Sequence, residues 1–283
     1  MDGREEMKVA LKSSDQFPLP ASLFMMNGNR PESTWDLFDK NRNRVDIIIR
    51  KQTEYGSKLM TFLCWNMVEP DNNPINPFIG NPTVKELKQR FYKMGDVGWD
   101  QAEVSRWKSV LSMGANPGVY LVPTIFCGDD RESTRDKEFV DWYVPIVIRA
   151  LYSTSAAYNL ISEASKSWDR SEIEYAVSVA KAAFDIEPKL APKPVFVHQQ
   201  GTDIGSKADG LMYEFKKNPW NANEYSGDEV INELRHVLSV YPKYVWPQEL
   251  AVLCEKDWAR DFSRRIRELA KTEPRIIGLP GPV

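Results

Sequence analysis

Two glutamates, Glu163 and Glu249, are the strongest candidates for chemistry in this sequence. Glu163 lies two residues beyond the apolar run 158–161, and Glu249 lies three residues beyond the run 244–246. Two carboxyl groups that face each other across a cleft can cleave a glycosidic bond, because one protonates the leaving oxygen while the other attacks the anomeric carbon or activates water. We therefore predict that these two glutamates form a catalytic pair acting on a sugar linkage.

Aromatic, amide and further polar side chains follow the ends of other apolar runs. A sugar ring presents apolar C–H faces and polar edges, so flat aromatic rings beside amide and carboxylate groups suit it. One of these residues, Glu214, could also take the place of Glu249 as the second catalytic carboxylate. We predict that a carbohydrate substrate contacts Trp65, Asn66, Trp168, His198, Gln199, Tyr213, Glu214, Trp220 and Trp246.

The composition narrows the function classes. The 283 residues include 9 Trp and 11 Tyr but only 2 His, which argues against metal sites built on several imidazoles. A net charge of -3 without a basic domain argues against a nucleic-acid partner. No apolar run resembles a signal peptide or a membrane span, so we expect no membrane partner. We also expect no metal and no cofactor. Cys64, Cys127 and Cys254 are far apart and have no CxxC spacing, as is typical of buried thiols.

The candidate residues need a scaffold, and the sequence alternates short β-rich runs with longer helical periods. This rhythm predicts βα units, and eight of them predict a (β/α)8 barrel, a fold with a typical length of about 250 residues. The alternative, a doubly wound open sheet, lacks a GxGxxG or GxxxxGK phosphate-binding fingerprint after any strand. The expected strands are Leu23 to Met26, Leu59 to Trp65, Val119 to Phe126, Tyr158 to Ile161, Val195 to His198, Gly210 to Tyr213, Tyr244 to Trp246 and Ile276 to Leu279.

Helices are expected between most of these strands. The pairs Asp100 with Glu103 and Ser226 with Glu229 have capping-box spacing, and apolar stripes recur at helical intervals near residues 139–151, 173–184 and 258–269. Too few residues separate the fifth and sixth strands for a full crossover helix, so that connection is predicted to be a loop. The eighth helix is predicted to be missing or replaced by the N-terminal segment. We expect one irregular barrel domain over residues 1–283, with residues 1–20 as an N-terminal extension.

The placement of the two glutamates resembles the retaining glycoside hydrolases of clan A, the cellulase and mannanase type of (β/α)8 barrel. The resemblance implies that Glu163 after strand four is the acid/base and Glu249 after strand seven is the nucleophile. It implies that Tyr213 supports the nucleophile. It also implies that His198 contacts either the substrate or the side chains that contact the substrate. The chain differs in having Ser162 where the family usually has Asn, and in lacking the usual Trp after strand eight. The resemblance predicts an atypical, endo-acting enzyme that degrades a β-linked poly- or oligosaccharide.

Two other functions stay open at this point. A metal-dependent sugar isomerase or aldolase would use Glu163, His198, Asp203 and Glu214 as ligands for Mg²⁺ or Mn²⁺. A non-catalytic carbohydrate-binding barrel would keep the binding residues without turnover. A Schiff-base aldolase is disfavoured, because neither Lys166 nor Lys216 lies in an apolar run that would lower its pKa.

Overall fold

The structure is a computed structural model that describes residues 21–22, 59–63, 120–127, 135–152, 155–185, 190–216, 226–248 and 257–277. Its strands form one parallel sheet, in which each strand pairs with its neighbours in the sequence. A doubly wound sheet reverses its strand order at a switch point, whereas a barrel keeps the chain order. The order therefore fits the barrel. The strands are β1 (Ala21–Ser22), β2 (Leu59–Leu63), β3 (Tyr120–Cys127), β4 (Tyr158–Ser162), β5 (Val195–Gln200), β6 (Gly210–Glu214) and β7 (Tyr244–Gln248).

The chain also occupies the place of an eighth strand. Val245 and Ile276 form a parallel bridge. The Val245 amide donates to the Arg275 carbonyl at 2.9 Å, and the Ile277 amide donates to the Val245 carbonyl at 3.1 Å. Residues 275–277 therefore lie beside β7, where the sequence predicts that the last strand begins.

The sheet is curved around an interior cluster of apolar side chains. This cluster joins residues of β3, β5, β6 and β7 to the residues just before β4 and to Ile277. Gly210 allows the Phe196 ring to lie against β6, because a Cβ at position 210 would collide with it. The cluster consists of Val122, Ala156, Ala157, Phe196, Met212, Trp246 and Ile277.

In the part of the chain that the structure describes, four long helices pack on the sheet: α6 (Lys137–Leu151), α7 (Arg170–Ala182), α8 (Gly227–Val240) and α9 (Asp257–Thr272). The expected capping box of Ser226 and Glu229 begins α8, and a second box of Asp169 and Glu172 begins α7. Each box satisfies two backbone N–H groups that the first turn of a helix leaves without partners. The apolar stripes predicted from the sequence thus lie on real helices.

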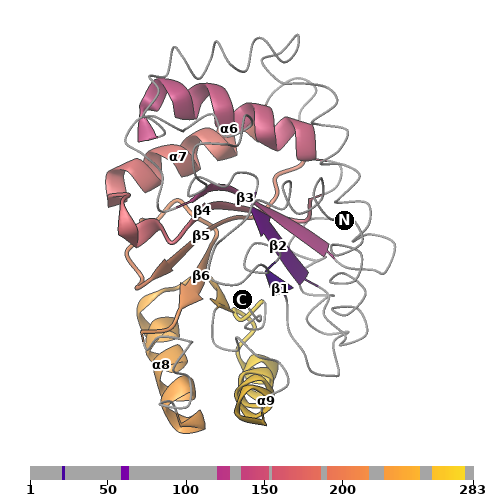
Figure 1. Ribbon diagram of the computed structural model, residues 1–283, viewed down its shortest axis with the longest axis vertical. Coiled ribbons are helices and arrows are strands. Elements are labelled where there is room, and N and C mark those ends of the chain that lie inside the picture. The colour runs from indigo at the N-terminus through magenta and orange to yellow at the C-terminus, as the bar shows by residue number, and fades with distance from the viewer. Residues whose placement is uncertain are drawn as a thin grey trace, which may run out of the picture.

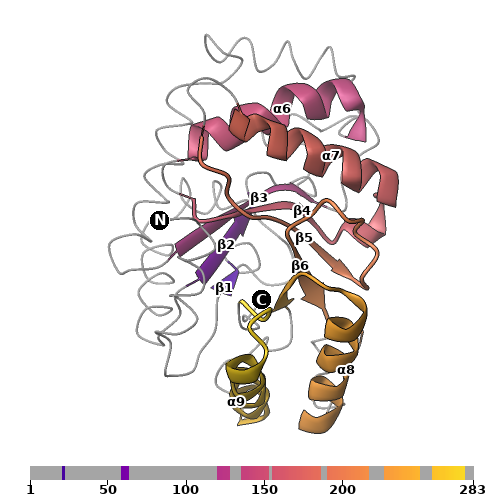
Figure 2. The same ribbon diagram turned by 180° about the vertical axis from the view of Figure 1, so that it is seen from behind.

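A second and larger cluster fills the layer between the sheet and the helices. It includes Val147 from α6, Val177 from α7 and Leu234 from α8, packed against outward-facing strand residues such as Leu211 and Val245. Figures 1 and 2 show α6 and α7 side by side over one part of the sheet, and α8 and α9 over another. The core therefore has the two layers of a barrel, one inside the sheet and one outside it.

The connection between β5 and β6 is a loop, as predicted. Residues 201–209 contain no helix, and the buried side chains of Ile204 and Ala208 cover the sheet there. Polar contacts fix the end of the loop that leads into β6. The Asp209 carboxylate accepts from the Val195 amide at 3.0 Å and pairs with Lys181 at 2.9 Å, while Lys243 donates to the Ala208 carbonyl at 2.5 Å.

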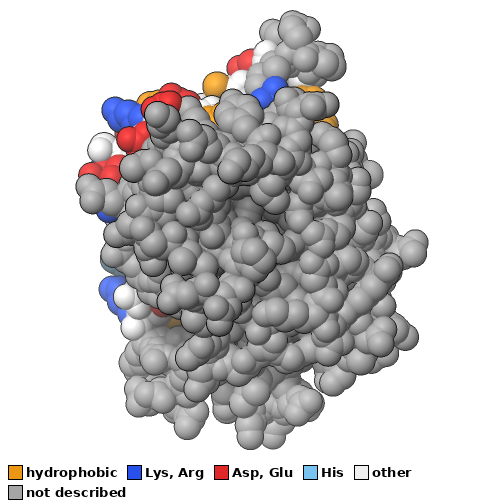
Figure 3. All heavy atoms as spheres, turned by 45° about the horizontal axis from the view of Figure 1, so that its top comes forward, with side chains coloured by type: hydrophobic (Ala, Val, Ile, Leu, Met, Phe, Trp, Pro, Cys, Tyr) orange, Lys and Arg blue, Asp and Glu red, His pale blue; other side chains and the backbone are white. Residues whose placement is uncertain are grey.

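Several predicted elements lie outside the described residues. These are the strand Leu23 to Met26, the helix that begins near Asp100, and the ends of the second and eighth strands; β1 is seen just before the first of them. Within the described part, none of the helices is long and apolar enough to cross a membrane. In the view of Figure 3, the described residues that reach the surface show acidic and basic side chains intermixed.

Candidate active site

Glu163 has an unusual backbone conformation directly after β4. Its φ of 52° and ψ of 43° are left-handed, and it begins the short 3₁₀ helix η2 (Ala164–Lys166). Among the described residues it is the only one other than glycine with a positive φ. This conformation costs on the order of 1–3 kcal/mol, persists only where the surrounding structure holds it, and is concentrated at active sites and other functional positions. The residue is partly exposed.

His198 on β5 contacts this turn. The imidazole is buried, with 2% of the residue exposed. Its Nδ1 lies 3.1 Å from the Ser162 hydroxyl oxygen and 3.4 Å from the Glu163 backbone nitrogen. The structure thus brings together two of the predicted site residues, Glu163 and His198, through the ends of β4 and β5. Ser162 joins them although the sequence did not identify it as a site residue; its only signal was its place before Glu163.

The contact with Glu163 fixes the tautomer of His198. A backbone N–H can only donate, so Nδ1 must accept, and the proton of the neutral imidazole is then on Nε2. The Ser162 hydroxyl can donate to the same nitrogen, and Nε2 is buried. His198 therefore presents its acceptor side to the turn that carries Glu163.

The ends of β5, β6 and β7 lie side by side at the same edge of the sheet. Gln200 is in register with Glu214, and Glu214 is in register with Gln248. Glu214 is partly exposed, and Gln199 is buried. In a parallel barrel this carboxyl edge is where active sites form. Glu249 follows Gln248 immediately but lies outside the described residues, as do Trp65, Asn66 and Trp220.

Tyr213 is directed away from this edge. Its hydroxyl donates to Oε1 of Glu233 on α8 at 2.8 Å, and the Lys216 amide donates to the same oxygen at 2.9 Å. Its ring packs edge to face against Phe215 with centroids 5.3 Å apart. Side chains alternate along a strand, and position 213 falls on the outer face. The structure thus places Tyr213 in the layer between sheet and helices instead of beside Glu163.

Trp168 and Trp246 are core residues instead of open platforms. Trp168 is 5% exposed and packs on Phe126 with centroids 5.2 Å apart. Trp246 is fully buried inside the barrel and meets Phe196 edge to face at 6.3 Å. A sugar ring needs an accessible aromatic face. The expectation that these two rings stack on substrate therefore does not fit their burial.

The alternative metal ligands are not gathered into a site. Among the described residues, which include Glu163, His198, Asp203 and Glu214, no three His, Cys, Asp or Glu side chains are arranged to hold a metal ion. Asp203 is 71% exposed and pairs with Arg170 at 3.2 Å. Lys216 is exposed as well, so it lacks the apolar surroundings of a Schiff-base lysine. Among the described side chains, these four residues therefore form no metal site and Lys216 provides no Schiff-base site.

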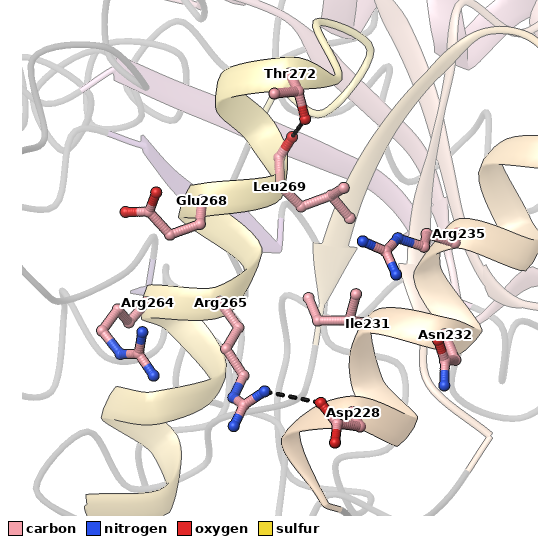
Figure 4. A pocket seen from close by; sticks show the side chains of 9 residues that line it. All are labelled: Asp228, Ile231, Asn232, Arg235, Arg264, Arg265, Glu268, Leu269 and Thr272. Carbon is pink, nitrogen blue, oxygen red and sulfur yellow. Dashed lines mark hydrogen bonds and ion pairs between the residues drawn. The ribbon is translucent and has the colours of Figure 1, made fainter.

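A groove of 540 Å³ lies elsewhere, between α8 and α9 (Figure 4). Ile231 and Leu269 supply apolar contacts from the two helices, and Arg265 bridges them through an ion pair with Asp228 at 3.0 Å. Arg265 also pairs with Asp261 at 2.6 Å. None of the predicted site residues that the structure describes lines this groove, so it is separate from the turn that carries Glu163.

No protein-family model matches the chain, and no curated protein matches its sequence. Solved structures match its fold. A glycoside hydrolase family 5 enzyme from Prevotella bryantii, in complex with a xyloglucan tetradecasaccharide, aligns with a TM-score of 0.57 at 13% identity over 93% of this chain and 88% of the other. A β-glucosidase from Exiguobacterium marinum aligns with a TM-score of 0.57 at 11% identity, over 94% of this chain and 87% of the other. The β-glycosidase of Thermosphaera aggregans aligns with a TM-score of 0.56 at 9% identity, over 94% of this chain and 88% of the other. The chain thus has the (β/α)8 barrel fold of these clan A-type glycoside hydrolases.

Proposed function

We propose that this protein is a retaining glycoside hydrolase that cleaves a β-linked poly- or oligosaccharide. The observation that carries the proposal is the left-handed turn at Glu163, which costs conformational energy at the carboxyl end of a barrel strand. The fold shared with several glycoside hydrolases supports it further. The xyloglucan oligosaccharide bound by one of these relatives supports an extended, β-linked substrate and endo action.

Two glutamates divide the chemistry in this proposal. In the first step Glu163 gives its proton to the glycosidic oxygen while the Glu249 carboxylate attacks the anomeric carbon, which releases the leaving alcohol and forms a glycosyl ester. In the second step Glu163 takes a proton from water, whose oxygen displaces Glu249 from the anomeric carbon. The sugar is released with its original configuration, and both glutamates return to their starting states.

A substrate screen with matched variants tests the proposal. The wild type is assayed on β-glucans, mannans, xylans and aryl β-glycosides beside Glu163→Gln, Glu249→Gln and Glu268→Gln. Glu268 is an exposed carboxylate on α9 and serves as the control. We expect hydrolysis by the wild type and the control, with a loss of at least about 10²-fold in each of the other two variants. No hydrolysis of any substrate by the wild type would overturn the proposal.

The product lengths decide the mode of action. An endo-acting enzyme cuts within the polymer, so the viscosity of a soluble β-glucan should fall well before much reducing sugar is released. A proportional release of short sugars from the first minutes would contradict endo action while leaving the glycosidase itself intact.

A further inference from the structure

We infer that His198 is a positioning residue that sets the orientation of Glu163 for proton transfer. The inference rests on the proposed function and assigns a specific task to a residue that the sequence suggests as a contact of the substrate or of the residues around it, or as a metal ligand. The geometry behind it is the convergence of the Ser162 hydroxyl and the Glu163 amide on one imidazole nitrogen, Nδ1.

The backbone needs such an acceptor at this point. Strands β4 and β5 pair in register at Tyr158 with Val195 and at Asn159 with Phe196, but the chain leaves the strand conformation at Glu163. The amide of Glu163 contacts the imidazole Nδ1 atom of His198 at 3.4 Å. A left-handed residue other than glycine persists only where surrounding contacts hold it. The imidazole supplies one of those contacts.

The imidazole is itself held firmly. His198 lies in the middle of β5, in register with Met212 on β6, and only 2% of the residue is exposed. A buried side chain on a central strand has little freedom to move, so its Nδ1 is a fixed reference point for the turn. The contact at 3.4 Å is long for a hydrogen bond and therefore weak. Its main effect is to orient the backbone at Glu163.

The expected effect concerns the acid step. A rotation of the backbone at Glu163 moves its carboxyl group relative to the bound glycosidic oxygen, and a misplacement of about 1 Å can lower a rate by about 10²-fold. Protonation by Glu163 matters most when the leaving group is a poor one. A leaving group that departs as a stable anion needs no proton, so its rate should respond little to the position of Glu163.

The test compares leaving groups across three variants. His198→Leu removes the acceptor, His198→Asn places an amide oxygen at the same distance along the side chain as Nδ1, and Ser162→Ala removes the other partner of Nδ1. Each protein is assayed on a series of aryl β-glycosides whose leaving groups range from dinitrophenol to unsubstituted phenol. The value of kcat/KM is the readout, because it reports the steps up to release of the phenol. Thermal unfolding of each variant confirms that it is folded.

We expect His198→Leu to lose about 10- to 10²-fold in kcat/KM on the phenyl glycoside and less than about 3-fold on the dinitrophenyl glycoside. His198→Asn should recover most of the loss. If His198→Leu does not fold, Ser162→Ala should show a smaller loss with the same dependence on the leaving group. An equal loss on all substrates in the folded variants, or no loss, overturns the positioning role while hydrolysis by the wild type leaves the proposed function standing. An inactive wild type refutes both.

Discussion

The hydroxyl group of Tyr213 on β6 lies 2.8 Å from the Oε1 atom of Glu233 on α8 and donates a hydrogen bond to it. The amide of Lys216 donates to the same oxygen at 2.9 Å. One carboxylate thus joins the end of a barrel strand, the loop that follows it and the next helix. This tie explains why a tyrosine at the end of β6 stabilises the scaffold without lying beside Glu163.

Replacement of Tyr213 should therefore affect stability more than activity. Tyr213→Phe keeps the ring contact with Phe215 but removes the hydrogen bond to Glu233, which should lower the free energy of unfolding by about 1 kcal/mol. Urea unfolding measures this change, and kcat/KM should remain within about 3-fold of the wild type because no group near Glu163 is altered. A loss of activity of 10²-fold or more without a change in stability would instead support the role that the sequence resemblance implied.

Tyr213 also shows what sequence reasoning could and could not provide. The alternation of strands and helices predicted the barrel, the loop between β5 and β6 and the capping box at Ser226, because these depend on local periodicity and spacing. The face on which a residue lies at a strand end depends on the strand register, and a shift of one residue reverses it. Tyr213 was predicted at the mouth, but the register of β6 places it in the outer layer. Trp246 and Trp168 are buried by packing inside the barrel and beside Phe126, which the sequence pattern does not reveal.

The turn at Glu163 should show a trade-off between activity and stability. Glu163→Gly and Glu163→Ala both remove the carboxyl group, so both should lose activity to a similar degree. Only glycine adopts a φ of 52° without strain. We therefore expect Glu163→Gly to be more stable than Glu163→Ala by about 0.5–1 kcal/mol in urea unfolding. A Glu163→Ala variant that is more stable than Glu163→Gly would show that position 163 carries no strain, because without strain glycine costs conformational entropy on folding.

The contact between Glu163 and His198 shows a similar limit. The sequence suggested both residues because it placed each at the end of an expected barrel strand, and adjacent strand ends meet in space. The contact between them was not predictable, because it depends on the left-handed turn after Ser162. No sequence rule assigns such a turn to a glutamate, since this conformation usually favours glycine or asparagine.

Tyr241 should make the protein sensitive to alkaline pH. Burial, together with the charge of Asp209, raises the pKa of its hydroxyl above the usual value of 10.0. The folded state therefore binds the proton more tightly than the unfolded state. The stability that this difference in proton binding contributes to the folded state is fully present below pH 10. It is lost as the pH rises above the pKa of the unfolded state.

The matched variant is Tyr241→Phe, because no described group bonds to this buried hydroxyl oxygen. Urea unfolding near neutral pH should show the variant to be as stable as the wild type or up to about 1 kcal/mol more stable. About one unit above pH 10 the wild type should lose stability that the variant keeps. A parallel decline of both proteins would show that other groups control alkaline unfolding.

The interior of the barrel should not tolerate a side chain at position 210. A Cβ there would collide with the Phe196 ring, which packs edge to face on Trp246. Gly210→Ala should therefore cost about 1–3 kcal/mol in the free energy of unfolding. The double variant Gly210→Ala with Phe196→Leu should cost less than the sum of the two single changes, because the smaller side chain makes room. If the free-energy costs of the two single changes simply add in the double variant, the cost of Gly210→Ala does not come from a collision with Phe196.

The anomeric configuration of the azide product tests the two-glutamate assignment most directly. Azide needs no base, so it can attack the glycosyl enzyme of a Glu163→Ala variant, and it can attack the substrate itself where Glu249→Ala has removed the nucleophile. With a dinitrophenyl β-glycoside, nuclear magnetic resonance should identify a β-glycosyl azide from Glu163→Ala and an α-glycosyl azide from Glu249→Ala. The contradicting result is an α-glycosyl azide from Glu214→Ala and none from Glu249→Ala, which would make Glu214 the nucleophile.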